Sequence, residues 1–207
     1  MPSFQQISDR LALHSPAEIS EHEGARAAVA MVLREGHEGP EVLFIERARR
    51  RGDPWSGHMA FPGGRVDPDD VDTQAAAERE TLEEVGLSLA EATPIGRLDD
   101  KTGNPRTASK LVISAYVYRL HQDPELSINH EVAHAFWFPV RGLLDPELHV
   151  GYDMEQYDIR MPGILVGEPD RHIVWGLTYS FLESFFIAVG EPLPERCDGG
   201  LRKFDRL

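Results

Sequence analysis

The sequence predicts an α+β fold in which a mixed β-sheet packs between helices. Two observations carry this prediction. Runs rich in β-branched and aromatic residues alternate along the 207-residue chain with two long helix-like segments. The length also suits one domain with a sizeable core. We expect that domain at residues 25–190, after an N-terminal helix and linker at 1–24 and before a polar tail at 191–207.

Local patterns predict the individual elements in order. Phe4, Ile7 and Leu11 recur at helical spacing and predict a short helix over residues 4–13. Two strand-like runs, 25–33 and 41–45, are separated by turn residues and predict a hairpin. The other expected strands are 58–61, 111–120, 132–138, 163–166 and 172–175. A largely buried helix is expected at 177–189.

The best helix candidate is the acidic segment 72–85. Asp72 suits an N-cap, and Gly86 suits a left-handed C-terminal cap. With about 100° of rotation per residue, the apolar side chains gather on one stripe, which we expect to face the core. That stripe contains Val71, Ala75, Leu82 and Val85.

Three carboxylates, Glu80, Glu83 and Glu84, fall on the opposite side of this helix, within an arc of about 100°. Like charges at this spacing repel by a few tenths of a kcal/mol, and a divalent cation would reverse the sign. Mg²⁺ prefers such oxygen ligands. Taken alone, the pattern also fits a solvated face on which Arg79 pairs with Glu83.

Composition excludes several classes of function. The net charge of −14, from 21 basic and 35 acidic residues, disfavours nucleic-acid binding. The sequence contains no run of about 18 apolar residues, so no membrane span is expected. The N-terminus lacks the pattern of a secretory signal. A single cysteine, Cys197, fits a reducing compartment. We therefore expect a cytoplasmic protein with neither nucleic-acid nor membrane partners.

The residues before the acidic helix change its interpretation. Gly64 lies in FPGGRVDPDD, and the helix then contains Arg-Glu-x-x-Glu-Glu-x-Gly. This combination resembles the Nudix box. The residues that match in place are Arg79, Glu80, Glu83, Glu84, Gly86 and Leu87. Thr81 departs from the usual aliphatic residue. Asp70 stands at the box's first acidic position, and one extra residue separates it from Arg79.

The preceding segment, RARRRGDPWSGHMAFPGG, is similar to the coenzyme A pyrophosphatase branch of Nudix hydrolases. Arg47, Ala48, Gly57 and residues 61–64 fit that branch. Its second arginine does not fall in register, so Arg50 or Arg51 could serve. The resemblance extends over about residues 25–189, although the strand LVISAYVY replaces a Pro-containing one.

The resemblance implies the Nudix fold and metal-dependent hydrolysis of a nucleoside diphosphate linked to another group. Coenzyme A or a thioester is the leading substrate, giving 3′,5′-ADP and a phosphopantetheine; ADP-ribose and nucleoside diphosphate sugars are the alternatives. A homodimer would be typical of the family.

The resemblance also implies roles for individual residues. The implied Mg²⁺ or Mn²⁺ ligands are Glu80, Glu83, Glu84 and the Gly64 carbonyl. Arg79 would orient a glutamate, and Arg47 and Arg65 would contact substrate phosphates. The general base stays open between Glu83 and a carboxylate from a later loop.

Two hypotheses of other classes compete with this one. Residues 130–134 read HEVAH, a zinc-protease pattern when it lies on a helix. We disfavour it because the residues that follow are β-prone and end at Pro139. The second alternative is a nucleotide-binding module of this fold without catalysis. Trp55 and Tyr118 are candidates for stacking on a base.

Overall fold

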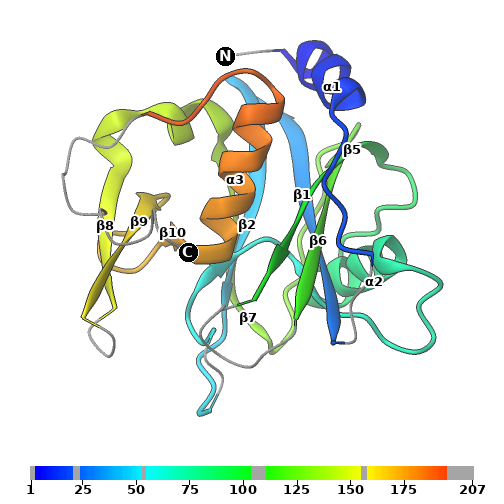
Figure 1. Cartoon of the computed structure of the whole chain (residues 1–207), viewed down its shortest axis with the longest axis horizontal. Helices are drawn as coiled ribbons and strands as arrows, with labels where there is room; N and C mark the ends of the chain where they lie inside the picture. The colour runs from blue at the N-terminus through cyan, green and yellow to red at the C-terminus, as the bar shows by residue number, and fades with distance from the viewer. Residues whose placement is uncertain (1–2, 21–23, 53–54, 104–110, 155–157, 195–207) are drawn as a thin grey trace.

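The computed structural model describes residues 3–20, 24–52, 55–103, 111–154 and 158–194 (Figure 1). Most of the predicted tail, including Cys197, lies outside the described residues. The helices are α1 Phe4–Leu13, α2 Thr73–Val85 and α3 Gly176–Ala188, with short 3-10 helices η1 Val140–Leu144 and η2 Pro146–Leu148. Within the described part of the chain, no helix combines the length and apolar character that crossing a bilayer requires.

The main sheet has seven strands and is mixed. Its continuous order is β3-β2-β1-β6-β5, with β4 paired to β1 and β7 paired to β2. The strand β1 runs parallel to β6 and antiparallel to β2 and β4. The bounds are β1 Arg26–Gly36, β2 Gly39–Arg47, β3 Met59–Ala60, β4 Gly63–Arg65, β5 Thr93–Thr102, β6 Val112–Arg119 and β7 Val132–Pro139.

A smaller antiparallel sheet of order β10-β9-β8 lies beside the main sheet, at the left of Figure 1. It consists of β8 His149–Met154, β9 Ile159–Leu165 and β10 Ile173–Trp175. Its inner face contributes Ile164 and Val174 to the core beneath α3. In the chain, the small sheet comes after the last strand of the main sheet and directly before α3.

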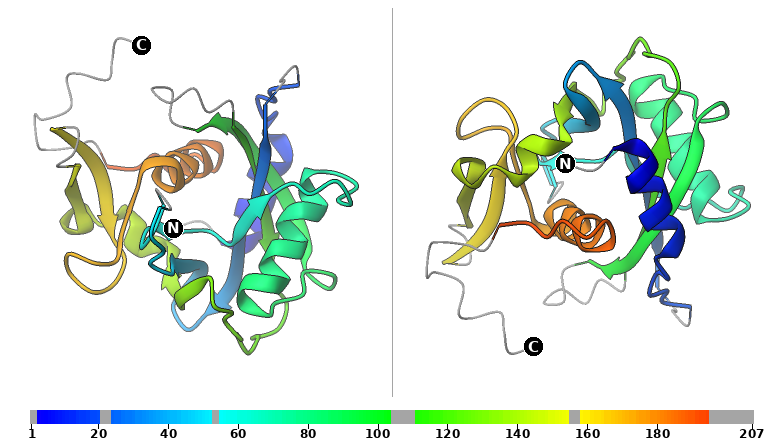
Figure 2. Two further views of the ribbon diagram at one scale, coloured as in Figure 1. Left: turned by 90° about the horizontal axis from the view of Figure 1, so that it is seen from below. Right: turned by 90° about the horizontal axis from the view of Figure 1, so that it is seen from above.

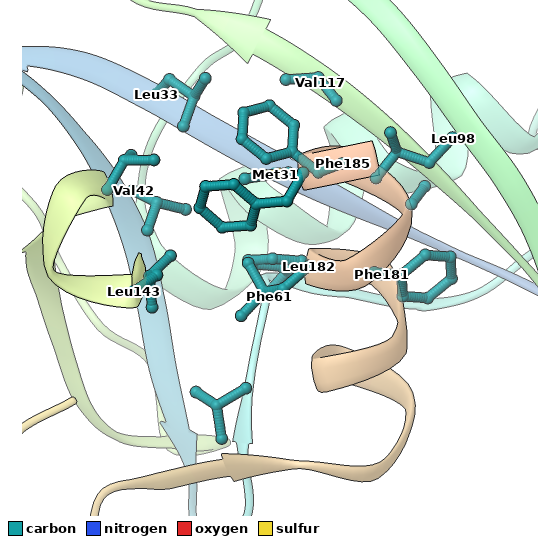
Figure 3. Close-up of a cluster of buried hydrophobic side chains, with 14 of the residues drawn as sticks. Met31, Leu33, Val42, Phe61, Leu98, Val117, Leu143, Phe181, Leu182 and Phe185 are labelled. Carbon is teal, nitrogen blue, oxygen red and sulfur yellow. The ribbon is translucent and has the colours of Figure 1, made fainter. Parts of the chain in front are cut away.

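Helices cover both faces of the main sheet, so the predicted α+β arrangement is confirmed (Figure 2). One core cluster joins α1 and α3 to one face, and the other joins α2 to the opposite face. In Figure 3, Leu182 and Phe185 of α3 lie beside Met31 and Phe61, and all four belong to the same core cluster. Alternate residues of a strand point to opposite faces, which is why β1, β2, β6 and β7 each contribute residues to both clusters.

The predicted hairpin, the later strands and all three helices form at the expected places. The sequence prediction missed β4, β5 and β8. The segment TPIGRLDDKT of β5 contains charged residues, and bulges interrupt its pairing with β6 between Pro94 and Gly96 and between Leu98 and Lys101. Each bulge breaks the alternation of apolar and polar residues by which a strand is recognised.

The predicted buried face of α2 is only partly correct. Val85 is buried as predicted, but Leu82 is 51% exposed and Val71, which precedes the helix, is 90% exposed, whereas Thr81 and Glu84 are buried. The helix packs against β1 and β4 with its small residues Ala76 and Ala77. Hydrogen bonds permit this burial, because Thr81 Oγ1 donates to the Ala77 carbonyl at 2.7 Å and Glu84 accepts from a backbone N–H.

Candidate active site

The strand β4 and the helix α2 bring the glycine pair and the acidic residues together. Gly63 has φ of +151°, and a Cβ there would lie 2.2 Å from the Ala28 carbonyl oxygen. Only glycine tolerates this conformation and this close approach to β1. Its backbone N–H donates to Glu84 Oε2 at 2.9 Å. The conformation of Gly63 thus directs its backbone N–H toward the carboxylate of Glu84 on α2.

Gly64 leaves the space that Glu80 occupies. A Cβ built on Gly64 would lie 2.4 Å from the carboxyl carbon of Glu80. Any larger residue would push this carboxylate away from β4. The two adjacent glycines therefore seat Glu80 and Glu84 side by side against one strand.

Glu84 is a buried acid whose nearest cationic group, the guanidinium of Arg47, lies beyond hydrogen-bond distance. Its side chain is only 2% exposed, and Arg47 Nη1 lies 3.7 Å from its Oε1. Burial raises the pKa of Glu84 to about 7; the Gly63 N–H and Arg47 oppose this rise, and Glu80 and Glu131 add to it. Near neutral pH the site therefore holds a carboxylate whose negative charge is poorly compensated.

Arg79 donates hydrogen bonds both to the loop after β4 and to the acidic helix. Its Nε and Nη2 donate to the two oxygens of Asp70 at 3.0 and 2.9 Å, a bidentate pair. Its Nη1 donates to Glu80 at 3.0 Å and lies 3.5 Å from Glu83, while Nη2 donates to the Arg65 carbonyl at 3.0 Å. The hydrogen bonds from Arg79 lower the pKa of Asp70. The guanidinium ties the loop after β4 to the acidic helix.

The Arg79–Asp70 pair forms despite the extra residue in the loop. Asp70 stands at the first acidic position of the predicted box, and both of its carboxylate oxygens accept hydrogen bonds from Arg79. The loop and helix of the predicted box therefore form one connected unit.

The carboxylates of the site fit a divalent cation by their chemistry. Glu83 is 55% exposed and Glu80 is 16% exposed, so both face the solvent side of the buried Glu84. Burial raises the pKa of Glu80, and repulsion from Glu83 and Glu131 adds to it. All the donors are oxygens, as Mg²⁺ and Mn²⁺ prefer. A cation would relieve the charge repulsion that contributes to the raised pKa values of Glu80 and Glu84.

The three glutamates point in different directions. Glu80 and Glu83 turn toward Arg79, while Glu84 turns toward Gly63 and Arg47. Among the described residues no group of three His, Cys, Asp or Glu side chains is already arranged to hold an ion. Mutual repulsion favours this separation, so binding of an ion would require the carboxylates to turn together.

Glu131 is a fourth carboxylate near the site, and the sequence did not single it out as a site residue. The Asn129 N–H, two residues before it, donates to the Glu84 carbonyl at 3.0 Å, and the charge of Glu131 raises the pKa of both Glu80 and Glu84. Arg50 Nη1 donates to Glu131 Oε1 at 2.9 Å, and the Ala48 N–H donates to the Glu131 carbonyl at 2.7 Å. In the sequence, the HEVAH pattern drew attention to Glu131, as the base of a zinc protease and as a less favoured candidate for a carboxylate that reaches the Nudix site.

The two residues predicted to contact phosphates both adjoin the acidic site. Arg47 ends β2, and its Nη1 lies 3.7 Å from Glu84 Oε1. Arg65 ends β4 with an exposed side chain, and its carbonyl accepts a hydrogen bond from Arg79.

The helix that the zinc-protease hypothesis requires does not form. The strand β7 covers Val132–Pro139, and His134 pairs across the ladder with Glu46. His130 and Glu131 lie in the turn before β7 and only His134 lies in the strand, so the two histidines are not one turn apart on a helix face. The stacking role considered for Tyr118 is also wrong, because Tyr118 is 1% exposed and donates to Glu78 at 2.8 Å.

We expect the stability of the metal-free protein to fall as the pH rises. The pKa of Glu84 is about 7 in the folded protein and about 4.5 in the unfolded chain, so the folded state binds the extra proton. Ionisation of Glu84 should lower the free energy of unfolding by up to roughly 3 kcal/mol between these pH values. Thermal unfolding at pH 5.5 and pH 8, with and without Mg²⁺, measures this effect. Mg²⁺ should raise the midpoint more at pH 8. An equal rise at both pH values would contradict the involvement of Glu84.

Comparison with known proteins agrees with this geometry. A family model described as the NUDIX domain matches residues 24–154. An uncharacterised protein of Schizosaccharomyces pombe is 42% identical over 113 residues, which cover 52% of this chain and 34% of that protein. The mitochondrial coenzyme A diphosphatase NUDT8 of Homo sapiens is 32% identical over 158 residues, covering 74% of this chain and 65% of that protein. The chain thus spans about one third and just under two thirds of these relatives' lengths.

Among solved structures, a MutT/nudix family protein from Enterococcus faecalis superposes with a TM-score of 0.55 at 18% identity. The match covers 91% of this chain and 70% of that chain. The match covers a larger share of the chain than the family model, which ends at residue 154, before β9, β10 and α3.

Proposed function

This chain belongs to the NUDIX domain family, and from that premise we propose that it is a metal-dependent pyrophosphohydrolase acting on coenzyme A or its thioesters. One observation supports the chemistry above all: Gly63 and Gly64 seat two carboxylates on β4, and Arg79 links these residues to the acidic loop. The similarity to NUDT8 and the resemblance in residues 47–64 favour coenzyme A as the substrate.

We assign the metal ligands to Glu80, Glu83 and Glu84, with Gly64 contributing its carbonyl, and the metal to Mg²⁺ or Mn²⁺. When bound, the ion neutralises charge on the diphosphate oxygens and lowers the pKa of a bound water. Arg79 holds Glu80 in place while Asp70 anchors the guanidinium.

The remaining charged residues position the substrate and accept a proton. Arg47 and Arg65 bind the phosphates beside the acidic site. Either Glu83 or Glu131 accepts the proton of the attacking water. The water oxygen bonds to one phosphorus as the anhydride P–O bond breaks, which yields 3′,5′-ADP and phosphopantetheine.

We further propose that the catalytic domain spans residues 25–190 and thus extends beyond the family-model match. The helix α3 supplies Phe181, Leu182 and Phe185 to the core under the main sheet. Removing it would expose that face of the sheet to water.

Product analysis by liquid chromatography and mass spectrometry tests the substrate. The panel is coenzyme A, acetyl-coenzyme A, ADP-ribose, UDP-glucose, NADH and a dinucleoside polyphosphate, each with Mg²⁺ or Mn²⁺. We expect 3′,5′-ADP and phosphopantetheine from coenzyme A, and their loss in the Glu83→Gln and Glu84→Gln variants.

Two other outcomes would change the proposal. Cleavage of ADP-ribose or UDP-glucose alone would keep the hydrolase and replace the substrate. Binding of the panel without turnover under any metal would favour the non-catalytic module.

A further inference from the structure

We propose that three aromatic side chains, His58, Tyr152 and Trp175, form a platform on which the purine base of the substrate stacks. This inference rests on the proposed function in that the base belongs to a nucleotide whose diphosphate occupies the acidic site. The three residues are called the aromatic platform below.

The aromatic platform is assembled from three separate segments. The rings of Tyr152 and Trp175 are stacked, with centroids 4.3 Å apart and planes inclined by 11°. The ring of His58 meets Trp175 edge-on, with centroids 4.6 Å apart and planes at 66°. Such offset and edge-to-face pairs are favourable arrangements of aromatic rings. Trp175 is therefore held in place from two sides.

The register of the small sheet brings two of the three rings together. Trp175 pairs with Gly163 between β10 and β9, and Tyr152 pairs with Met161 between β9 and β8. Gly163 and Met161 are two residues apart and lie on the same face of β9, so the side chains of Trp175 and Tyr152 share one face of the small sheet.

The aromatic platform belongs to neither hydrophobic core. His58, Tyr152 and Trp175 are each half-buried, and neither Tyr152 nor Trp175 packs against the two core clusters. Large aromatic side chains contribute most to stability when a core encloses them. Rings that are ordered by one another and still reach solvent are suited to a planar ligand.

Backbone pairing places the aromatic platform one strand from the acidic site. The Arg47 N–H donates to the His58 carbonyl at 3.0 Å, and the guanidinium of the same Arg47 lies 3.7 Å from Glu84. Residues opposite each other in neighbouring strands have Cα atoms about 5 Å apart. In the view from below, the segment leading into β3 lies between the small sheet and α2 (Figure 2).

Two polar contacts hold the small sheet in this position. Arg171 Nη2 donates to the buried Glu46 at 2.8 Å, which joins the turn before β10 to β2. Thr178 Oγ1 at the start of α3 donates to the Met59 carbonyl at 3.2 Å. Trp175 lies between these two contacts in the chain and is therefore fixed beside His58.

The charge near the aromatic platform fits a nucleotide. The chain has a net charge of −14, yet four of the five residues 47–51 are arginines. The Arg49 side chain lies over Gly57, next to His58, with Nε 3.5 Å from a Cβ built there. A base has two π-faces for stacking and a neighbouring phosphate for arginine, whereas a pantetheine arm has no aromatic ring.

Titration calorimetry with 3′,5′-ADP in the presence of Mg²⁺ tests this inference without requiring turnover. We expect Trp175→Leu to weaken binding by about ten- to a hundredfold, and Trp175→Phe to change it only a few-fold. The matched control is Trp137→Leu, because Trp137 lies on β7 over Arg34 and outside the aromatic platform. Tyr152→Leu is a second test on another strand, with an expected weakening in the same direction. Thermal unfolding confirms that each variant is folded.

The possible results separate the platform from the proposed function. If Trp175→Leu and Tyr152→Leu both bind 3′,5′-ADP like the wild type, the aromatic platform is not the base site, whatever substrate is hydrolysed. Weaker binding of 4′-phosphopantetheine instead of 3′,5′-ADP also overturns the proposal. Weaker binding of 3′,5′-ADP alone supports the platform even if coenzyme A is not hydrolysed, and in that case only the proposed function fails.

Discussion

Replacing Glu84 by glutamine should abolish most hydrolysis and at the same time stabilise the metal-free protein. Glutamine keeps the size of glutamate and an oxygen that can accept the Gly63 N–H, which lies 2.9 Å from Glu84. It cannot supply the negative charge for a metal ligand. We expect turnover to fall on the order of 10²–10³-fold, a range typical for removing a group that stabilises charge in the transition state.

The same substitution that lowers activity should raise the stability of the metal-free protein, because a neutral amide avoids burial of a charge. Ionised Glu84 is 2% exposed and has only a distant cation, so above pH 7 it destabilises the fold. Glu84→Gln should therefore unfold at a higher temperature than the metal-free wild type at pH 8, and the difference should shrink at pH 5.5. Enzyme assays and thermal unfolding at both pH values measure the two parts.

Glu83→Gln is the matched control, since Glu83 is 55% exposed on the same helix. This variant should lose activity without gaining stability. If Glu84→Gln were less stable than the wild type at pH 8, the assignment of Glu84 as a strained, buried ligand would be wrong.

Replacing Arg79 by lysine should cost both activity and stability despite the unchanged charge. Lysine has one ammonium and cannot bond both oxygens of Asp70 while also reaching Glu80 and the Arg65 carbonyl. Turnover should fall about 10- to 100-fold, as expected when a residue that orients a metal ligand is lost. The Asp70 side chain is 6% exposed, and its incomplete pairing should cost roughly 2–3 kcal/mol.

Chemical denaturation and steady-state assays of Arg79→Lys test both effects. Asp70→Asn is the matched partner, because it should reproduce most of the stability loss through the same bidentate pair. The double variant should then lose less than the sum of the two single changes. Strict additivity would show that Arg79 and Asp70 do not act as one unit.

These predictions share one physical basis: α2 is oriented to place its carboxylates in the site, although this orientation lowers the stability of the fold. The helix buries Glu84 and leaves Leu82 half-exposed, the reverse of what burial of apolar surface alone would favour. The two glycines of β4 support this orientation, because Gly64 leaves room for the Glu80 carboxylate and the Gly63 N–H donates to Glu84. In the same orientation Glu83 is exposed to solvent and Glu80 is only partly accessible.

The sequence by itself determined the features that depend on local pattern. The helices, the hairpin and most strands follow from spacing of apolar residues and from caps such as Asp72 and Gly86. The box residues could also be identified, because the spacing of Arg79, Glu80, Glu83 and Glu84 lies within one stretch of helix. Local sequence is sufficient for these features because each depends on residues a few positions apart.

Only the tertiary structure decided what depends on distant segments. The buried face of α2 was set by close packing on β4, where hydrogen bonds made burial of Thr81 and Glu84 tolerable. The approach of Glu131 and the meeting of His58 with Trp175 join segments more than 40 residues apart. Periodicity carries no information on such contacts, because they arise from how strands and helices pack once the sheet has formed.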